Sequence, residues 1–146
     1  MKKLLLATDG SEYSLESLQK IIPMAKALEA KLTVLSVAEE FPLLRGTEGM
    51  SKEEIEALVG SINRESELGL KRARELFEKE GIHVETMIRA GKPAELIIEE
   101  AEKGNFDLII LGDTGRGGLK ELFLGSVSNK VVHQARTDVM IVKRKG

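Results

Sequence analysis

The sequence predicts an α/β fold, a single open five-stranded parallel sheet with helices on both faces. Short aliphatic runs alternate along the chain with longer segments whose apolar residues recur at three- and four-residue spacing. The runs are typical of strands covered on both faces, and the spacing is typical of one face of a helix. Strands that alternate with helices form a parallel sheet with right-handed crossovers. With 146 residues, the chain is expected to form one domain over residues 1–146.

The first part of the chain contains two predicted strands and a helix. Lys3–Thr8 and Leu32–Val37 are the aliphatic runs expected to form the strands. Pro23 lies inside the helical pattern between them and is expected to kink the helix or tighten its turn. Ala38–Met50 has no steady period and is expected to be a loop. The predicted inner face of the helix consists of Leu15, Leu18, Ile21, Ile22, Ala25 and Leu28.

A long helix is predicted over Lys52–Glu80. It begins at a capping box, in which the Ser51 side chain accepts from a free N–H and Glu54 reaches back. Gly81 is well placed to end it. Its many Glu and Lys residues are most simply a solvated face. Its predicted inner face consists of Ile55, Leu58, Val59, Ile62, Ala73, Leu76 and Phe77.

The second half of the chain contains the other three predicted strands, His83–Ile88, Asp107–Leu111 and Val139–Val142. Gly91-Lys92-Pro93 is expected to open the helix after the first of these, because proline suits the first helical turn. Ser126–Gln134 is predicted to be the last helix. The order of elements therefore continues the alternation of strand and helix to the end of the chain.

Composition excludes several kinds of site. The chain has no cysteine and only two histidines, His83 and His133, which excludes disulfides, cysteine zinc sites and histidine-rich metal sites. Both histidines are expected to lie on the surface or to be half-buried. A net charge of −2 gives no reason to expect nucleic acid or an anionic membrane as a partner. The first apolar run is too short for a signal peptide and no run could span a membrane, so a cytoplasmic protein is expected.

Two strand ends carry residues that suggest a ligand. Ala7–Ser11 follows the first predicted strand, and the glycine-rich segment Gly112–Gly118 follows the fourth. Open α/β sheets bind ligands at the carboxyl ends of their strands, where the strand order reverses. If these two strands are neighbours, both segments face one crevice. The simplest arrangement therefore places the switch point between the first and fourth strands.

The glycine-rich segment suits a phosphate group. Glycine lets the backbone approach a ligand, and successive N–H groups form a concavity that binds anions. Gly125 and Ser126 then open a helix, whose first N–H groups are free, and the hydroxyls of Ser126 and Ser128 could donate to phosphate oxygens. The alternative is a flexible turn followed by a serine that only caps the helix. No P-loop, no G-x-G-x-x-G after a strand and no G-x-S-x-G elbow is present.

Gly112-x2-Gly115-x9-Gly125-Ser126 matches the G-x2-G-x9-G-[S/T] motif of ATP-binding universal stress proteins. The chain resembles this family over nearly its whole length. The resemblance implies the strand order 3-2-1-4-5, which agrees with the switch point inferred above. It also implies dimerisation through the last strand, Val139–Val142.

The resemblance also implies roles for individual residues. Asp9 would lie beside the nucleotide, near the ribose or a metal ion, and Val37 would meet the adenine through its backbone. Leu111 and Gly112 would pack near the ribose. Gly115, Gly125, Ser126, Val127 and Ser128 would cradle the phosphates. The complete expected set is Ala7, Thr8, Asp9, Val37, Leu111, Gly112, Gly115, Gly125, Ser126, Val127 and Ser128.

Two places depart from the family pattern. Thr137-Asp138 replaces a Cys-Pro or Lys-Pro pair that is often seen before the last strand, so a different path into the dimer strand is open. Asp113 stands where the family often has serine or another small neutral residue. Either this carboxylate points to solvent or caps a turn, or a Mg²⁺ ion is shared by Asp113 or Asp9 and the phosphates. Both aspartates are therefore candidate metal ligands.

The implied function is an adenine-nucleotide-binding module for stress response or signalling, with ATP, ADP or AMP as the ligand. Asp9 is the one good candidate for a general base, so no catalytic set is predicted and only a slow ATPase activity stays open. A nucleotide-free dimeric interaction module of the same fold is the alternative. An ATP-pyrophosphatase or adenylyltransferase is disfavoured because the S-G-G-x-D-[S] and H-x-G-H signatures are both missing.

Overall fold

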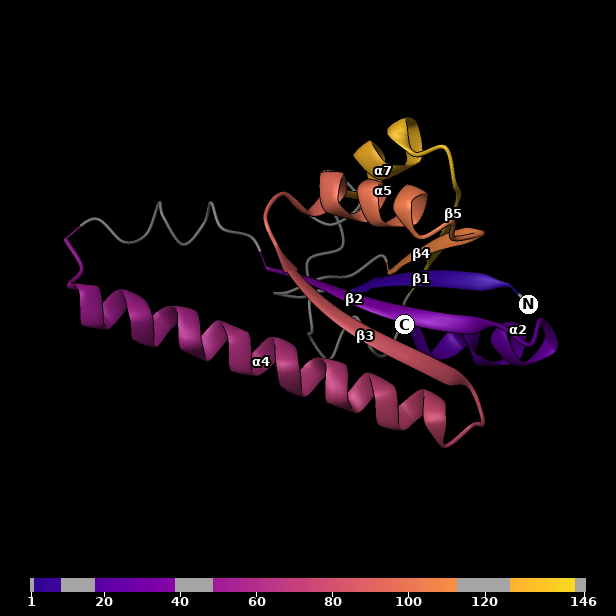
Figure 1. The fold of residues 1–146 in the computed structure, drawn as a ribbon, viewed down its shortest axis with the longest axis horizontal. Helices are drawn as coiled ribbons and strands as arrows, with labels where there is room; N and C mark the ends of the chain where they lie inside the picture. Colours follow the sequence, from indigo (N-terminus) through magenta and orange to yellow (C-terminus); the bar gives the residue numbers. More distant parts are fainter. Residues whose placement is uncertain (1, 9–17, 39–48, 113–126, 144–146) are drawn as a thin grey trace.

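The computed structural model of the chain describes residues 2–8, 18–38, 49–112 and 127–143, without the side chains at 58–63 and 65 (Figure 1). Its centre is a five-stranded sheet in the order β3-β2-β1-β4-β5, and every strand pairs in parallel with its neighbours. The predicted fold class and strand order are therefore confirmed. The strands are β1 (Lys3–Thr8), β2 (Lys31–Ala38), β3 (His83–Ala90), β4 (Leu108–Gly112) and β5 (Asp138–Val142).

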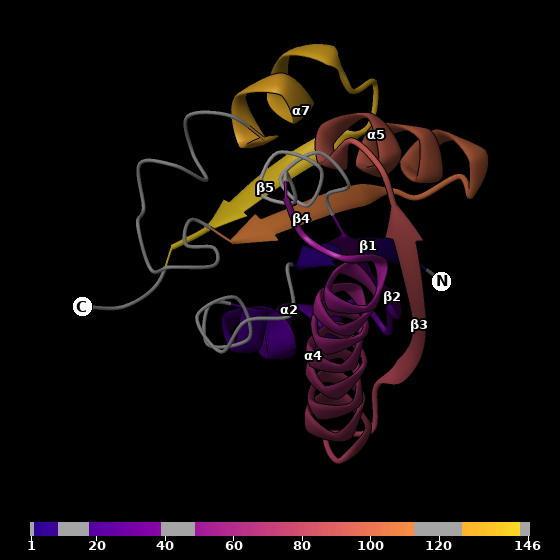
Figure 2. The same ribbon diagram turned by 90° about the vertical axis from the view of Figure 1, so that its left-hand side faces the viewer.

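Two layers of helices cover the sheet. Figure 2 shows α2 and α4 on one side of the strands and α5 and α7 on the other. The described helices are η1 (Gln19–Ile21), α2 (Ile22–Ala27), α4 (Lys52–Glu78), α5 (Pro93–Lys103) and α7 (Asn129–Gln134). In the part of the chain that the structure describes, none of them is long and apolar enough to cross a membrane.

Alternation along the strands divides the core into two clusters. In β1, Leu4 and Leu6 face the α2 and α4 layer, whereas Leu5 and Ala7 face the α5 and α7 layer. All four side chains are at most 2% exposed, so β1 is buried on both faces, as its continuous aliphatic sequence predicts. Fully buried Phe77 joins the first cluster and Val131 joins the second.

The predicted helix signals after residue 50 form as expected. The backbone N–H of Glu54 donates to Ser51 Oγ over 3.1 Å at the start of α4. Gly81 follows the helix with a φ of +80°, a conformation that glycine adopts readily. Pro93 is in the first turn of α5. The long helix ends at Glu78, two residues before the predicted end. The last helix is α-helical over Asn129–Gln134, and its predicted start at Ser126 lies outside the described residues.

Two expectations about inner faces need correction. Leu28 is 41% exposed, because α2 ends at Ala27 and the chain then turns through Glu29, whose φ is +51°. Along α4 the buried stripe of the described side chains is Ser66, Leu70, Ala73 and Phe77, and the predicted Ile55 and Leu76 are only half-buried. The side chains of Leu58, Val59 and Ile62 lie outside the described set.

Candidate functional site

The carboxyl ends of β1, β2 and β4 meet at one edge of the sheet. Ala7 is in register with Leu35 on one side and Leu111 on the other, and Thr8 is in register with Ser36. β1 and β4 are therefore neighbours, as inferred from their unusual end residues. The predicted switch point lies between them, with Gly112 as the last residue of β4.

Some of the residues predicted to bind the nucleotide have side chains in the hydrophobic core, and others lie at the carboxyl edge of the sheet. The side chains of Ala7 and Leu111 are 2% and 0% exposed and pack into the core beneath α5 and α7. Only their backbone is available to a ligand at the strand ends. Val37 and Val127 are half-buried against the same cluster, whereas the side chain of Thr8 is buried on the opposite face of β1.

Ser128 connects this edge to the last helix. It is 3% exposed and precedes α7, which packs onto α5 through the fully buried Val131. Lys130, in the first turn of α7, contacts Glu95 of α5 over 3.1 Å. The hydrogen bond and charge of Lys130, with a further contribution from the charge of Lys92, hold the pKa of Glu95 below its ordinary value. This exposed ion pair joins the first turns of α7 and α5.

The other predicted site residues lie outside the described residues. These are Asp9, Asp113, Gly115, Gly125 and Ser126. Within the described ranges, no group of three or more His, Asp or Glu side chains is arranged to hold a metal ion. Both candidate metal ligands are outside those ranges, so the Mg²⁺ site stays a prediction.

A buried hydroxyl lies next to the predicted site. Ser36 is fully buried, and among the described residues its Oγ has no hydrogen-bond partner. It lies between Thr8 of β1 and Ile88 of β3 in the register of the sheet. An unsatisfied buried hydroxyl costs about 1–3 kcal/mol. Its signal in the sequence is a serine near the carboxyl end of an otherwise aliphatic run.

An ion pair that sequence reasoning missed ties the end of β3 to α5. Arg89, in register with Val37, places Nη2 2.7 Å from Oε1 of Glu100. Glu100 is 7% exposed, which is unusual for a carboxylate and calls for a partner. Its position on the same helical stripe as Ile97 and Ala101 was the available signal. The pair orients the end of β3, which lies next to the end of β2 that carries Val37.

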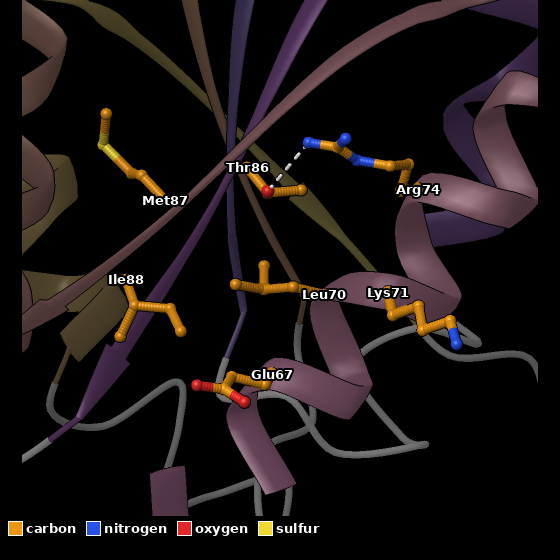
Figure 3. Close-up of a pocket in the computed structure, with 7 residues that line it drawn as sticks. All are labelled: Glu67, Leu70, Lys71, Arg74, Thr86, Met87 and Ile88. Carbon is orange, nitrogen blue, oxygen red and sulfur yellow. Dashed lines mark hydrogen bonds between the residues drawn. The ribbon is translucent and has the colours of Figure 1, made fainter. Parts of the chain in front are cut away.

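A hollow of about 530 Å³ lies elsewhere, between α4 and the edge strand β3 (Figure 3). None of the residues predicted to hold a nucleotide lines it. Its lining combines apolar, hydroxyl and charged side chains. They are Glu67, Leu70, Lys71 and Arg74 of α4 and Thr86, Met87 and Ile88 of β3.

The match to known proteins decides the family. The model of the universal stress protein family matches residues 1–143 of this chain. The chain belongs to the universal stress protein family.

Individual relatives of this universal stress protein agree with that assignment. It is 34% identical over 144 residues to universal stress protein MJ0531 of Methanocaldococcus jannaschii, covering 98% of this chain and 82% of that protein. The solved structure of protein MJ0577 from the same organism has a TM-score of 0.75 and 29% identity, covering 99% of this chain and 97% of that one. A universal stress protein in complex with cAMP shares the fold, with a TM-score of 0.67 and 24% identity, covering 99% and 98%.

Proposed function

We propose that this universal stress protein binds an adenine nucleotide at the carboxyl edge of β1, β2 and β4. The observation that carries the proposal is the motif Gly112-x2-Gly115-x9-Gly125-Ser126, which starts at the end of β4, directly beside the end of β1. A ligand at a switch point between two such strands is the usual arrangement in open α/β sheets. ATP is the proposed ligand, with ADP and AMP as alternatives.

The described edge fits such a ligand. Val37 and Val127 are half-buried at this edge, the first proposed to lie beside the adenine and the second beside the phosphates. Thr8 and Ser128 are the polar residues at the ends of β1 and before α7. In this proposal Val37 meets adenine through its backbone, Gly112 lies near the ribose, and Ser128 is on the phosphate side. The glycine-rich segment provides N–H donors to the phosphates.

The proposed role is that of a cytoplasmic module that senses or signals through nucleotide occupancy. Asp9 lies one residue beyond β1 and is the proposed neighbour of the ribose or of Mg²⁺. Slow hydrolysis would need this carboxylate as the base, so we propose binding, with turnover at most slow. The protein that was solved with cAMP also has this fold, and its ligand is consistent with an adenine nucleotide here.

A pair of buried threonines gives a matched test of the site. Thr8 ends β1 at the carboxyl edge and is 4% exposed, whereas Thr33 is 7% exposed near the amino end of β2. Valine has nearly the same shape as threonine and removes only the hydroxyl. We expect Thr8→Val to weaken ATP binding measured by calorimetry, and Thr33→Val to leave it unchanged. Equal affinities in all three proteins would show that the nucleotide does not use this edge at Thr8.

Bound ligand should also be visible directly. Native mass spectrometry of freshly purified protein should reveal a resident adenine nucleotide. A nucleotide at a hundredfold excess over Kd should stabilise the fold by about 2.7 kcal/mol. Gly115→Val should abolish the resulting rise in melting temperature, because a side chain would enter the phosphate space. No thermal shift and no calorimetric signal in the wild type would favour the nucleotide-free interaction module.

A homodimer through Val139–Val142 is part of the proposal. β5 is an edge strand, and Val139, Met140 and Ile141 are only half-buried along it. An unprotected edge strand invites pairing with another chain. Light scattering at micromolar concentration should give about twice the monomer mass of 16.0 kDa. A monomer mass under these conditions would contradict the dimer without affecting the nucleotide site.

A further inference from the structure

The hollow beside β3 exposes the edge of this strand. Successive residues of a strand point to opposite faces of the sheet, yet Thr86, Met87 and Ile88 all line the same hollow (Figure 3). The side chain of Met87 packs against the cluster beneath α5 and α7, on the face opposite α4, so the hollow beside α4 reaches the backbone of the strand at this residue. β3 ends the sheet on this side, so alternate backbone groups of the strand have no partner strand there. Ile88 is also 40% exposed, an apolar side chain at the same edge.

Charged side chains of α4 line the other wall of the hollow. Glu67, Lys71 and Arg74 all reach it, and among the described residues none of the three forms an ion pair. Arg74 donates a hydrogen bond to Thr86 Oγ1 over 3.0 Å, which leaves its charge uncompensated (Figure 3). The wall therefore carries both signs of charge within two helical turns.

We propose that this edge is an interface with a second copy of the chain, in which two β3 strands pair antiparallel about a two-fold axis at Met87. In that register Glu85 lies opposite the partner's Arg89, and Arg89, which also contacts Glu100 of its own chain over 2.7 Å, lies opposite the partner's Glu85. Opposite charges directly across an antiparallel pair are stabilising, and like charges are destabilising. Thr86 lies opposite the partner's Ile88, and Met87 meets its own copy on the axis.

The charges of α4 follow the same symmetry. A two-fold axis perpendicular to the sheet places both copies of α4 on one face, running antiparallel. Along the wall of the hollow, the charged residues of α4 are Glu67, Lys71 and Arg74, in that order. Reversal of this series sets Glu67 against the partner's Arg74, and places Lys71 at the midpoint, where it faces its own copy.

This pattern identifies a second copy as the occupant, rather than a strand of a different protein. An isologous interface requires a surface that is complementary to itself after a two-fold rotation. Glu85 and Arg89 of β3 have opposite charges on the two sides of Met87, and Glu67 and Arg74 of α4 have opposite charges on the two sides of Leu70. Met87 and Leu70 both line the same hollow. A partner with a charge of one sign would meet repulsion from half of these groups.

The absence of cysteine from the sequence makes disulfide trapping a direct test. Residues opposite each other in an antiparallel pair have Cα atoms about 4.5–5.5 Å apart, within the range that a disulfide spans. We expect Met87→Cys to form a disulfide-linked dimer under mild oxidation, seen on a non-reducing gel. Glu85→Cys is the control, because the two copies of residue 85 would be displaced by four residues, about 13 Å along the strands. We expect at least about tenfold less dimer from this variant.

A second set of variants tests the charges. In the Met87→Cys protein, Glu67→Lys should lower the yield of linked dimer severalfold, because it sets a lysine against the partner's Arg74. Glu99→Lys makes the same change on α5, on the face of the sheet opposite α4, and should leave the yield unchanged (Figure 2). Circular dichroism melting curves should show that all variants are folded. Equal yields from Met87→Cys and Glu85→Cys, or from the two lysine variants, would overturn the proposal. The readout is specific to β3 and holds whether or not nucleotide binds or β5 also pairs.

Discussion

Loss of the ion pair between Arg89 and Glu100 should measurably destabilise the fold. Arg89→Met keeps most of the aliphatic stem and removes the guanidinium, which lies 2.7 Å from Glu100. The side chain of Glu100 is only 10% exposed, so its carboxylate would lose a charged partner while it stays largely out of water. Removing one partner of a buried ion pair destabilises a protein by more free energy than the intact pair contributes, because the other charge stays buried without a counter-ion.

The size of this destabilisation follows from the exposed fractions of the Glu100 and Arg89 side chains. Removing one partner of a fully buried ion pair costs about 3–5 kcal/mol. The side chain of Arg89 is 46% exposed, so water can reach the freed carboxylate, and the cost should fall to about 1–2 kcal/mol. The entropy of unfolding of 146 residues is about 0.3 kcal/mol/K, so the melting temperature should fall by about 3–7 °C.

Two further variants make the assay decisive. Lys103→Met removes a partner of Glu99 on the same helix, at 3.9 Å and with both side chains more than 60% exposed, and it should change the melting temperature little. The double variant Arg89→Met/Glu100→Leu removes both charges and should recover most of the loss, because leucine continues the apolar stripe of α5. A loss in Arg89→Met no larger than in Lys103→Met would refute the reasoning.

Three other predictions concern separate parts of the molecule. Ser51→Ala should destabilise the protein by about 1 kcal/mol in thermal melts, because Glu54 N–H loses its acceptor. Lys130 lowers the pKa of Glu95 in the folded protein below the ordinary pKa of 4.5. The stabilisation from this carboxylate is therefore fully present above pH 4.5 and is lost as the pH falls through the lowered pKa. Glu95→Gln should flatten this fall of the melting temperature in acid. ATP affinity measured by calorimetry should weaken in EDTA, and Asp113→Ser should remove that dependence if Asp113 holds the Mg²⁺ ion.

Much of the fold could be predicted because the strand signals are local. Each aliphatic run became a strand with bounds that shift by two residues or fewer at either end, since a strand covered on both faces has little freedom in composition. Leu28 was placed wrongly because periodicity alone does not say where a helix ends. Leu70 and Ser66 were missed on α4, because the buried stripe there depends on how the helix crosses the sheet.

The candidate site could be predicted only in part. The adjacency of β1 and β4 followed from the residues at their ends and is confirmed. The Arg89–Glu100 pair joins residues of a strand and a helix through the fold, so no sequence pattern states that they meet. The orphan hydroxyl of Ser36 likewise depends on which neighbours surround it. These features arise from long-range packing, which local propensity does not encode.

The two proposed interfaces would use opposite edges of one sheet, and this has a consequence for assembly. Two-fold axes perpendicular to the sheet at β3 and at β5 are parallel to each other, so both contacts together would extend an open ribbon. The contacts differ in chemistry: Val139, Met140 and Ile141 make the β5 edge apolar, whereas the β3 contact depends on matched charges. Raising salt from about 0.1 M to about 1 M shortens the Debye length from about 10 Å to about 3 Å. We therefore expect high salt to reduce disulfide trapping at Met87→Cys while the reduced protein keeps its dimer mass in light scattering. Trapping that is unchanged by salt would show that the charges of Glu85, Arg89 and α4 do not set the pairing.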